Sequence, residues 1–160
     1  MNSRQFTFLT REEAYLKGGD FNPDRMIELL KDIETQALRE GFAGLRVTGE
    51  MSWILTKKPG VDRLIEYEAK LNDFIPSSKS IALCQYHERL FEPDILYDVL
   101  RTHPLIIIHD QLCENPYFLP TDEFMIISRG ERVTKHIYER IRDDILERQD
   151  SLNERKRADE

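Results

Sequence analysis

Apolar side chains recur at intervals of three and four residues in three segments of the chain, the spacing that places them on one face of a helix. These segments are residues 23–40, 61–74 and 93–102. The first has the clearest boundaries, because Asn22 is a favoured N-cap residue and Pro23 suits the first turn of a helix. We therefore expect three amphipathic helices.

Apolar runs of strand length alternate with these helices. The runs are residues 44–49, 81–86 and 104–109, and the last is an unbroken row of branched side chains, typical of a parallel strand covered on both faces. A shorter alternating segment, residues 5–9, predicts a further strand, and residues 11–16 predict one or two helical turns. Strands that alternate with helices indicate an α/β fold with a mostly parallel sheet flanked by helices.

The C-terminal part of the chain has a different pattern. Residues 131–153 predict a long polar helix, and residues 155–160 are expected to fray. The narrow apolar stripe of this helix contains Tyr138, Ile141, Ile145 and Leu152. Two interpretations stay open: a dimerising coiled coil or signal-transmitting helix, or a helix folded back on the sheet.

Composition narrows the class of protein. The chain has 160 residues, the length of one domain with an appendage, and a net charge of -7, which does not suit a surface that neutralises phosphates. No run approaches the ~18 apolar residues of a membrane span, and the amino terminus lacks the apolar core of a secretion signal. The two cysteines fit reduced thiols. We therefore expect a cytoplasmic protein without direct nucleic-acid or membrane contact.

Acidic, aromatic and sulfur-containing side chains stand at the ends of the predicted strands or on the helix between them. In an open α/β sheet, ligands bind just outside the carboxyl ends of the strands. An acid, a thiol, aromatic rings and an imidazole suit a small-molecule pocket with a few polar groups. The residues predicted to bind a small ligand are Glu50, Trp53, Glu68, Cys84, Gln85, Tyr86 and His109.

Two of these residues have a second interpretation. Glu68 falls on the apolar stripe of the predicted helix 61–74, where a carboxylate either lies at the margin and reaches water or is held by a buried donor. Cys84 is either a ligand contact or a small buried hydrophobic side chain. The sequence leaves both pairs of alternatives open.

Metal binding and catalysis have weaker support. Cys84, His87, His109 and Cys113 offer two donor pairs with zinc-like spacing, but the short gap after Cys84 contains no glycine turn. The sequence contains no Gly-rich phosphate loop, no Gly-x-Ser-x-Gly elbow and no His-Glu-x-x-His. We therefore expect neither a cofactor nor an enzymatic activity, and keep the zinc site as an alternative.

Several separated motifs together resemble a known family. They are residues 42–53, 64–68 with Asn72, 82–86, 100–104 and 114–118. In this order they resemble the MEDS domain, a methanogen and methylotroph sensory domain of the DcmR type, over about residues 5–124. The resemblance implies a prokaryotic signal-transduction domain that senses small hydrocarbon derivatives, such as C1 or methylated compounds. It also implies a downstream kinase, PAS, GAF or regulator module, and a fold similar to RecA and KaiC without their phosphate loop.

The amino end departs from that family. Its members usually begin with a further strand, helix and strand ahead of the region equivalent to Gln5, and we expect this segment to be missing here. Two interpretations stay open: the sequence is a fragment, or its sheet is completed differently, for example by a partner chain. An incomplete sheet exposes an edge or an apolar face, so we expect a homodimer. We assign residues 1–128 to a partial MEDS-like α/β domain and residues 129–160 to a charged C-terminal helix. The expected function is a sensor that binds a small organic ligand and signals through that helix; the alternative is a dimerisation or interaction module without a ligand.

Overall fold

The computed structural model describes residues 5–127 and 135–158, without the side chains of residues 125–127. The chain divides into two compact units, residues 1–85 and residues 86–160. Each unit has its own helices and its own two-stranded sheet. No helix in the described parts of the chain combines the length and the apolar character needed to cross a membrane.

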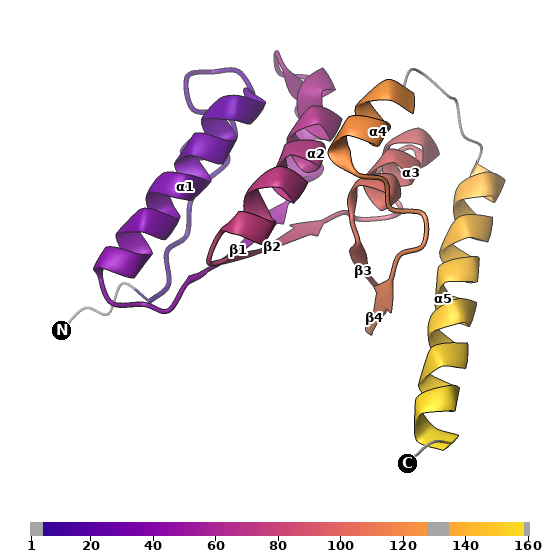
Figure 1. Ribbon diagram of the computed structural model, residues 1–160. Helices are drawn as coiled ribbons and strands as arrows, with labels where there is room; N and C mark the ends of the chain where they lie inside the picture. Colours follow the sequence, from indigo (N-terminus) through magenta and orange to yellow (C-terminus); the bar gives the residue numbers. More distant parts are fainter. Residues whose placement is uncertain (1–4, 128–134, 159–160) are drawn as a thin grey trace. The chain divides into compact units, whose positions relative to one another are not determined.

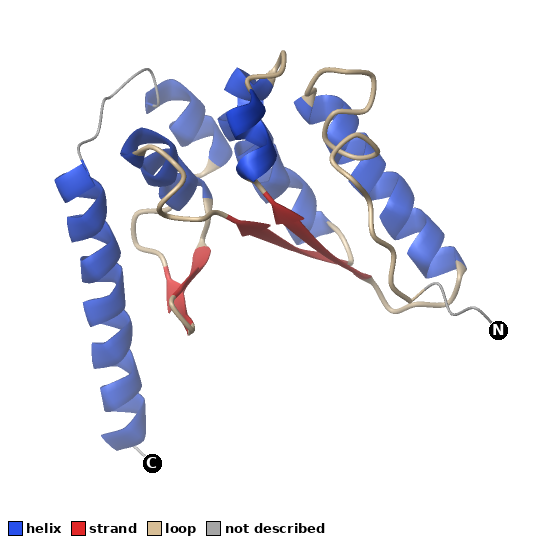
Figure 2. Ribbon diagram, turned by 180° about the vertical axis from the view of Figure 1, so that it is seen from behind, coloured by secondary structure: helices blue, strands red, loops and turns tan. Residues whose placement is uncertain are grey.

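The first unit is built around a β-α-β crossover. β1 (Leu45–Glu50) and β2 (Ser80–Gln85) run parallel, and the connection between them contains α2 (Leu64–Phe74), as a parallel pair requires. α1 (Pro23–Arg39) precedes β1, and both helices lie on the same side of the sheet (Figures 1 and 2). Short 3₁₀ helices complete the connection at Ser52–Thr56, Val61–Arg63 and Ile75–Ser77.

The two strands alternate between a covered and an exposed face, because successive side chains of a strand point in opposite directions. Val47, Ala82 and Cys84 are half-buried, and the hydrogen bond of Cys84 to Glu68 of α2 shows that this face carries the helices. Ile81 and Leu83 point the other way and are 62% and 42% exposed. Unit 1 therefore has two layers, with apolar side chains exposed on the outer face of its sheet.

α1 forms where the sequence predicts it. The side chain of Asn22 accepts a hydrogen bond from the N–H of Arg25, and Pro23 lies in the first turn. Met26, Ile27 and Leu30 are buried, which confirms the predicted amphipathic stripe over the first half of the helix. In the second half the stripe is less buried, since Leu38 is exposed.

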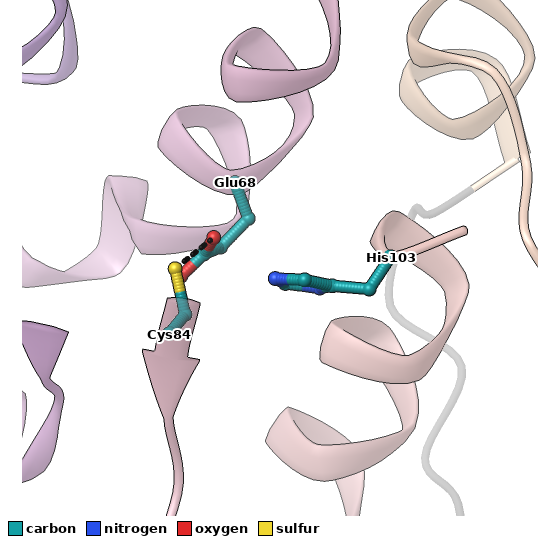
Figure 3. Close-up of side chains that lie close together, drawn as sticks. All are labelled: Glu68, Cys84 and His103. Carbon is teal, nitrogen blue, oxygen red and sulfur yellow. Dashed lines mark hydrogen bonds between the residues drawn. The ribbon is translucent and has the colours of Figure 1, made fainter. Parts of the chain in front are cut away.

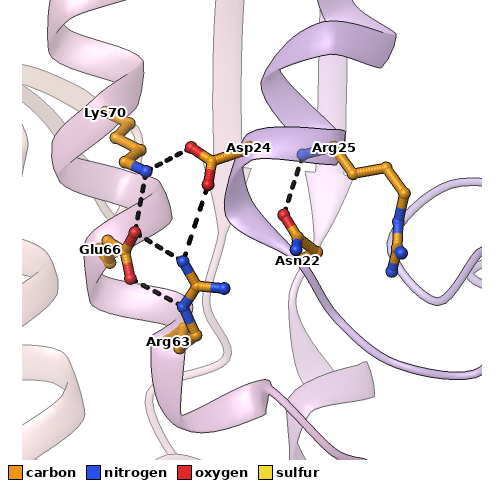
Figure 4. Close-up of polar contacts among 6 residues, drawn as sticks. All are labelled: Asn22, Asp24, Arg25, Arg63, Glu66 and Lys70. Carbon is orange, nitrogen blue, oxygen red and sulfur yellow. Dashed lines mark hydrogen bonds and ion pairs between the residues drawn. The ribbon is translucent and has the colours of Figure 1, made fainter.

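An ion-pair network links α1 to α2 (Figure 4). Lys70 contacts Asp24 and Glu66, and Arg63 lies 2.8 Å from Glu66 and 3.8 Å from Asp24. The hydrogen bond from Arg63 lowers the pKa of Glu66 to about 2, so this carboxylate is charged at neutral pH. Because the partners are partly exposed, the network contributes more to the relative orientation of the two helices than to stability.

In its described residues, the second unit combines three helices with a hairpin. Its elements are α3 (Pro93–Thr102), β3 (Leu105–Ile108), β4 (Gln111–Glu114), α4 (Thr121–Ile127) and α5 (Lys135–Ala158). β3 and β4 pair antiparallel around a tight turn in which His109 has a left-handed φ of 56°. α5 packs against α3 and β4 and buries Tyr138 and Ile145, whereas Leu152 is exposed.

The structure corrects the predicted strands. Residues 104–109 were expected to form a buried parallel strand, but β3 pairs antiparallel with β4 and exposes Leu105 and Ile107 by more than half. Residues 5–9 form no strand, and residues 11–18 form hydrogen-bonded turns rather than a helix. The described residues thus contain one parallel and one antiparallel strand pair, so a mostly parallel sheet is wrong for them. A fold similar to RecA and KaiC stays a prediction.

The C-terminal helix is confirmed over most of its predicted range. It continues to Ala158, beyond the predicted end, while predicted residues 131–134 lie outside the described part of the chain. Its packing on α3 and β4 shows that one side of the apolar stripe is covered within its own unit. A coiled coil between two copies of the chain stays a prediction.

Replacement of Asn22 by alanine tests the start of α1. The substitution removes the acceptor for the N–H of Arg25, so the free energy of unfolding should fall by about 1 kcal/mol in urea denaturation. Asn22→Ser keeps an acceptor oxygen and should lose much less stability. Equal losses in the two variants would show that this side chain does not act as a cap.

Candidate functional site

A buried carboxyl group meets a thiol between α2 and β2 (Figure 3). Glu68 is 1% exposed, and its Oε2 accepts a hydrogen bond from the Sγ of Cys84 at 3.3 Å. Glu68 lies on the buried face of α2, and strand alternation directs Cys84 toward the same layer. The interpretation of Glu68 as a marginal, water-reaching side chain is therefore wrong, and the interpretation with a buried donor holds.

Four aromatic rings pack together in the same unit. Tyr15 stacks on Trp53 with ring centroids 4.6 Å apart, and Phe21 lies 4.8 Å from Trp53. Tyr67 meets Phe21 edge-on at 5.7 Å and Tyr15 at 6.4 Å. Such offset and edge-to-face contacts are the favourable geometries for aromatic pairs. We call Tyr15, Phe21, Trp53 and Tyr67 the aromatic cluster.

Gly49 allows Tyr15 to connect the aromatic cluster with the buried pair. A Cβ atom at position 49 would lie 1.9 Å from the hydroxyl oxygen of Tyr15, so that oxygen occupies the space of a side chain. Gly49 is the ladder partner of Cys84. The Tyr15 hydroxyl therefore lies directly on the strand pair that carries the thiol.

Burial keeps three acidic groups of this site protonated. It raises the pKa of the Cys84 thiol well above its usual range, and the neighbouring Glu68 carboxylate raises it further. Burial also raises the pKa of Tyr67 and of Tyr15, with smaller contributions from Cys84 and Glu68. All three groups are thus hydrogen-bond donors at neutral pH. A protonated thiol is also a poor nucleophile and a poor metal ligand.

Trp53 carries an unsatisfied donor. Its Nε1 atom is buried without any hydrogen-bond partner, and no other side-chain nitrogen or oxygen among the described residues is in this state. A buried donor without an acceptor costs about 1 to 3 kcal/mol. The indole N–H is therefore a point at which an added acceptor would stabilise the site.

Three of the seven predicted ligand-binding residues lie in this part of unit 1. They are Trp53, Glu68 and Cys84. The aromatic cluster includes Trp53, and Tyr15 joins that cluster to the strand position beside Cys84. The structure thus brings together an indole, a carboxyl group and a thiol from three separate elements.

Glu50 and Gln85 point away from these residues. They are ladder partners on the exposed face of the sheet, one position beyond the covered Gly49 and Cys84. The carboxylate of Glu50 accepts hydrogen bonds from the N–H and hydroxyl of Ser52 at 2.9 and 2.7 Å. The predicted grouping of Glu50 and Gln85 with Cys84 is therefore not found, because neighbouring strand residues face opposite sides.

The remaining two predicted residues belong to the second unit. The ring of Tyr86 meets Phe91 in an edge contact at 5.2 Å. His109 is exposed in the turn between β3 and β4. Its predicted place at the edge of a parallel sheet is wrong, because β3 is not part of such a sheet.

The alternative zinc ligands do not assemble within either unit. Cys84 lies in the first unit, and the other three lie in the second. His87 is exposed and its Nδ1 accepts the N–H of Arg89, whereas Cys113 is fully buried in β4. Within either unit taken alone, no three described His, Cys, Asp or Glu side chains bring their ligand atoms within 4.8 Å of one another.

Sequence reasoning missed Tyr15, Tyr67 and Gly49. Tyr67 lies on the buried stripe of α2, between Leu64 and Leu71, so helical periodicity contained a signal for it. Tyr15 lies in a segment of turns without periodicity, and only the tertiary structure shows where it inserts.

The fold and site define a small α/β protein with a buried polar and aromatic site rather than a nucleotide-binding loop. Residues 1–104 match the model of the family described as the methanogen/methylotroph, DcmR sensory domain, MEDS. The chain belongs to the MEDS family of sensory domains, and the resemblance drawn from its separated motifs is confirmed.

One curated relative supports this assignment. The chain is 30% identical over 83 residues to the transcriptional repressor DcmR of Methylorubrum extorquens (strain DSM 6343 / CIP 106787 / DM4). The aligned region covers 51% of this chain and 31% of the repressor, so the chain spans less than a third of that protein. No solved structure matches the chain.

Alkaline unfolding tests the protonated state of the site. Because the pKa of Cys84 is raised in the folded chain, the unfolded chain loses its thiol proton first as the pH rises. Stability should therefore be complete below about pH 8.5 and fall above it, by at most about 1.4 kcal/mol per pH unit for this group. Tyr15 and Tyr67 should add to the fall above about pH 10.

Urea denaturation between pH 7 and pH 11 measures this dependence. Cys84→Ala should remove most of the fall between about pH 8.5 and pH 10 and leave above pH 10 the part that comes from Tyr15 and Tyr67. Cys113→Ala is the matched control; its thiol pKa is also raised, by burial, but less, so its removal should flatten the curve less. An unchanged curve in Cys84→Ala would contradict a buried, protonated thiol.

Proposed function

We propose that this chain is a prokaryotic sensory domain without enzymatic activity that binds a small organic ligand in unit 1. Membership of the MEDS family supports a sensory role. The observation that carries the ligand site is the part-buried hydrogen bond between the buried Glu68 and Cys84, connected through Tyr15 to the aromatic cluster. Hydrocarbon derivatives such as C1 or methylated compounds are the proposed ligand class.

The chemistry of the site suits such a ligand. Aromatic faces provide apolar contact for methyl or halogen groups, while a few convergent polar groups determine orientation. Trp53, Tyr67 and Cys84 present an indole N–H, a phenol and a thiol in a buried environment. Buried polar groups of this kind stabilise a core poorly unless they are all paired, so their presence favours a binding role.

We further propose α5 as the output element. Its Gln149 accepts the N–H of Glu114 at 3.2 Å, and its Asp144 accepts the hydroxyl of Tyr117 at 2.8 Å. These hydrogen bonds connect the helix to β4 and to the segment after it. A shift of the helix would therefore break them and form others, which is a change between two discrete states. The relative is a transcriptional repressor, and we propose that a downstream regulator or kinase module carries the effector function, since a net charge of -7 does not suit direct nucleic-acid binding.

A panel of small compounds tests the ligand site. Methanol, methylamine, trimethylamine and dichloromethane represent the proposed class, and thermal unfolding is followed at increasing concentration of each. A ligand that binds only the folded chain should raise Tm, with about 2.7 kcal/mol of added stability at a hundredfold excess over Kd. Cys84→Ala and Trp53→Phe should abolish the rise while retaining the far-UV circular dichroism of the wild type.

Cys113→Ala is the matched control, because it removes the other buried cysteine, which lies in the second unit. It should keep the full Tm response. A response that survives in Cys84→Ala and Trp53→Phe would place the ligand elsewhere. No response in the panel, together with no small molecule in native mass spectra of the purified chain, would favour an interaction module.

Exposed apolar side chains favour that second candidate function. On the outer face of the first unit's sheet they are Ile81 and Leu83, and on the hairpin of the second unit they are Leu105, Ile107 and Leu112. Paired strand residues point to the same side, so Ile107 and its partner Leu112 form one apolar surface. Such surfaces are typical of protein interfaces, which supports the proposed homodimer.

Analytical ultracentrifugation at tens of micromolar tests the dimer. The wild type should sediment as a dimer, and Ile107→Glu should weaken the association at least tenfold, because a charge is placed on the apolar surface. Thr35→Glu adds the same charge at an exposed polar position of α1 and should have little effect. A monomeric wild type under these conditions would refute the dimer.

A further inference from the structure

The segment before α1 delivers one aromatic side chain into the site. Residues 5–20 contain turns but no helix or strand, and Figure 1 shows them as the indigo loop beside α1. Phe6 and Phe8 are 83% and 79% exposed, whereas Tyr15 is inserted against Trp53. The segment is therefore attached through Tyr15 and the buried Leu16, which enter the core, and at its end through Asp20, which accepts hydrogen bonds from Arg25.

The position of Tyr15 depends on the absence of a side chain at Gly49. The contact involves only the tip of the tyrosine, so a Cβ at position 49 would displace the ring rather than strain the backbone. At the end of the segment, Gly18 and Gly19 have φ values of 94° and 93°, a region that glycine adopts without steric cost. The segment thus joins α1 through two glycines whose left-handed backbone turns the chain.

With Tyr15 in place, the indole of Trp53 has an aromatic partner, but its N–H has no hydrogen-bond acceptor. The Tyr15 ring covers the indole of Trp53 and gives its N–H no acceptor. A guest that takes the place of the ring would keep the aromatic contact, and an acceptor atom on that guest would add the missing hydrogen bond. The retained aromatic contact and the added hydrogen bond both favour exchange of the tyrosine ring for the guest.

We propose that Tyr15 is a plug that occupies the ligand's place, and that the ligand is a compact neutral molecule with an apolar body and one hydrogen-bond acceptor. The apolar body replaces the Tyr15 ring against Trp53, and the acceptor pairs with the indole N–H. This inference rests on the proposed sensory function and adds the identity of the displaced group and the chemistry of the ligand.

Acrylamide quenching of Trp53 fluorescence tests the plug, because Trp53 is the single tryptophan of the chain. Quenching should be weak in the wild type and at least twofold stronger in Tyr15→Ala and in Gly49→Ala, which keeps the tyrosine but displaces it. Tyr117→Ala, a tyrosine deletion in the second unit, is the matched control and should quench like the wild type. Circular dichroism and cooperative urea unfolding identify any variant that is merely unfolded. Unchanged quenching in both folded variants would overturn the plug.

Titration with toluene and anisole tests the ligand chemistry, because the two probes differ in one ether oxygen. Both should bind Tyr15→Ala and Gly49→Ala at least fivefold more tightly than the wild type. Anisole should bind about three to ten times more tightly than toluene, the effect of one hydrogen bond. Equal binding of the two probes would overturn the role of the indole N–H, and equal binding by wild type and variants would overturn the plug.

The outcomes separate this inference from the proposed function. If the C1 and methylated compounds leave the wild type unchanged while the two variants bind anisole, the plug stands and the proposed ligand class falls. If those compounds bind the wild type and Tyr15→Ala with equal affinity, sensing stands and the plug falls.

Discussion

The pairing of Gly49 with Cys84 is the constraint on which the site depends. A parallel register of β1 and β2 places a residue without a side chain beside a thiol on the covered face of the sheet. The thiol meets Glu68 of α2, and the space above the glycine receives the hydroxyl of Tyr15. A shift of either strand by one residue would turn that strand's position to the exposed face and separate the thiol from the glycine.

Placing these groups in the core has a thermodynamic consequence. Burial of Tyr15, Tyr67 and Cys84 raises the pKa of each, which means that the surroundings disfavour their charged forms. An all-apolar core of the same shape would be at least as stable, because polar groups lose water when they are buried. Several buried polar groups lie close together here, and one indole N–H has no acceptor. This arrangement is typical of a ligand-binding site.

Local patterns predicted the elements well and their pairing less well. The helical stripes and the cap at Asn22 identified α1, α2 and α3, and apolar runs identified β1 and β2, since periodicity and capping act within a few residues. Residues 104–109 were misinterpreted because a run of branched residues also suits a hairpin strand with one exposed face, and the turn at His109 was not recognised.

The site was predictable only in part, for a related reason. Helical spacing singled out Glu68, and a buried donor was one of its two interpretations. Glu50 and Gln85 were grouped with Cys84 because all three end a strand. The face to which each side chain points, which alternates along a strand, was left out. Tyr15 has no local signal at all, because its position is determined by the space over Gly49, which lies 34 residues further along the chain.

A plug also determines how sensitive a sensor can be. If the ligand binds only when Tyr15 has left, the apparent Kd equals the intrinsic Kd divided by the open fraction, so an open fraction of about 1% weakens binding about a hundredfold. The contacts of Tyr15 with Trp53 and Gly49 then determine the response threshold without contacting the ligand. The same equilibrium links the site to residues 5–20. A partner that binds the exposed Phe6 or Phe8 only when Tyr15 is displaced would favour the open state. By reciprocity, the partner would strengthen ligand binding by the factor by which the ligand strengthens partner binding.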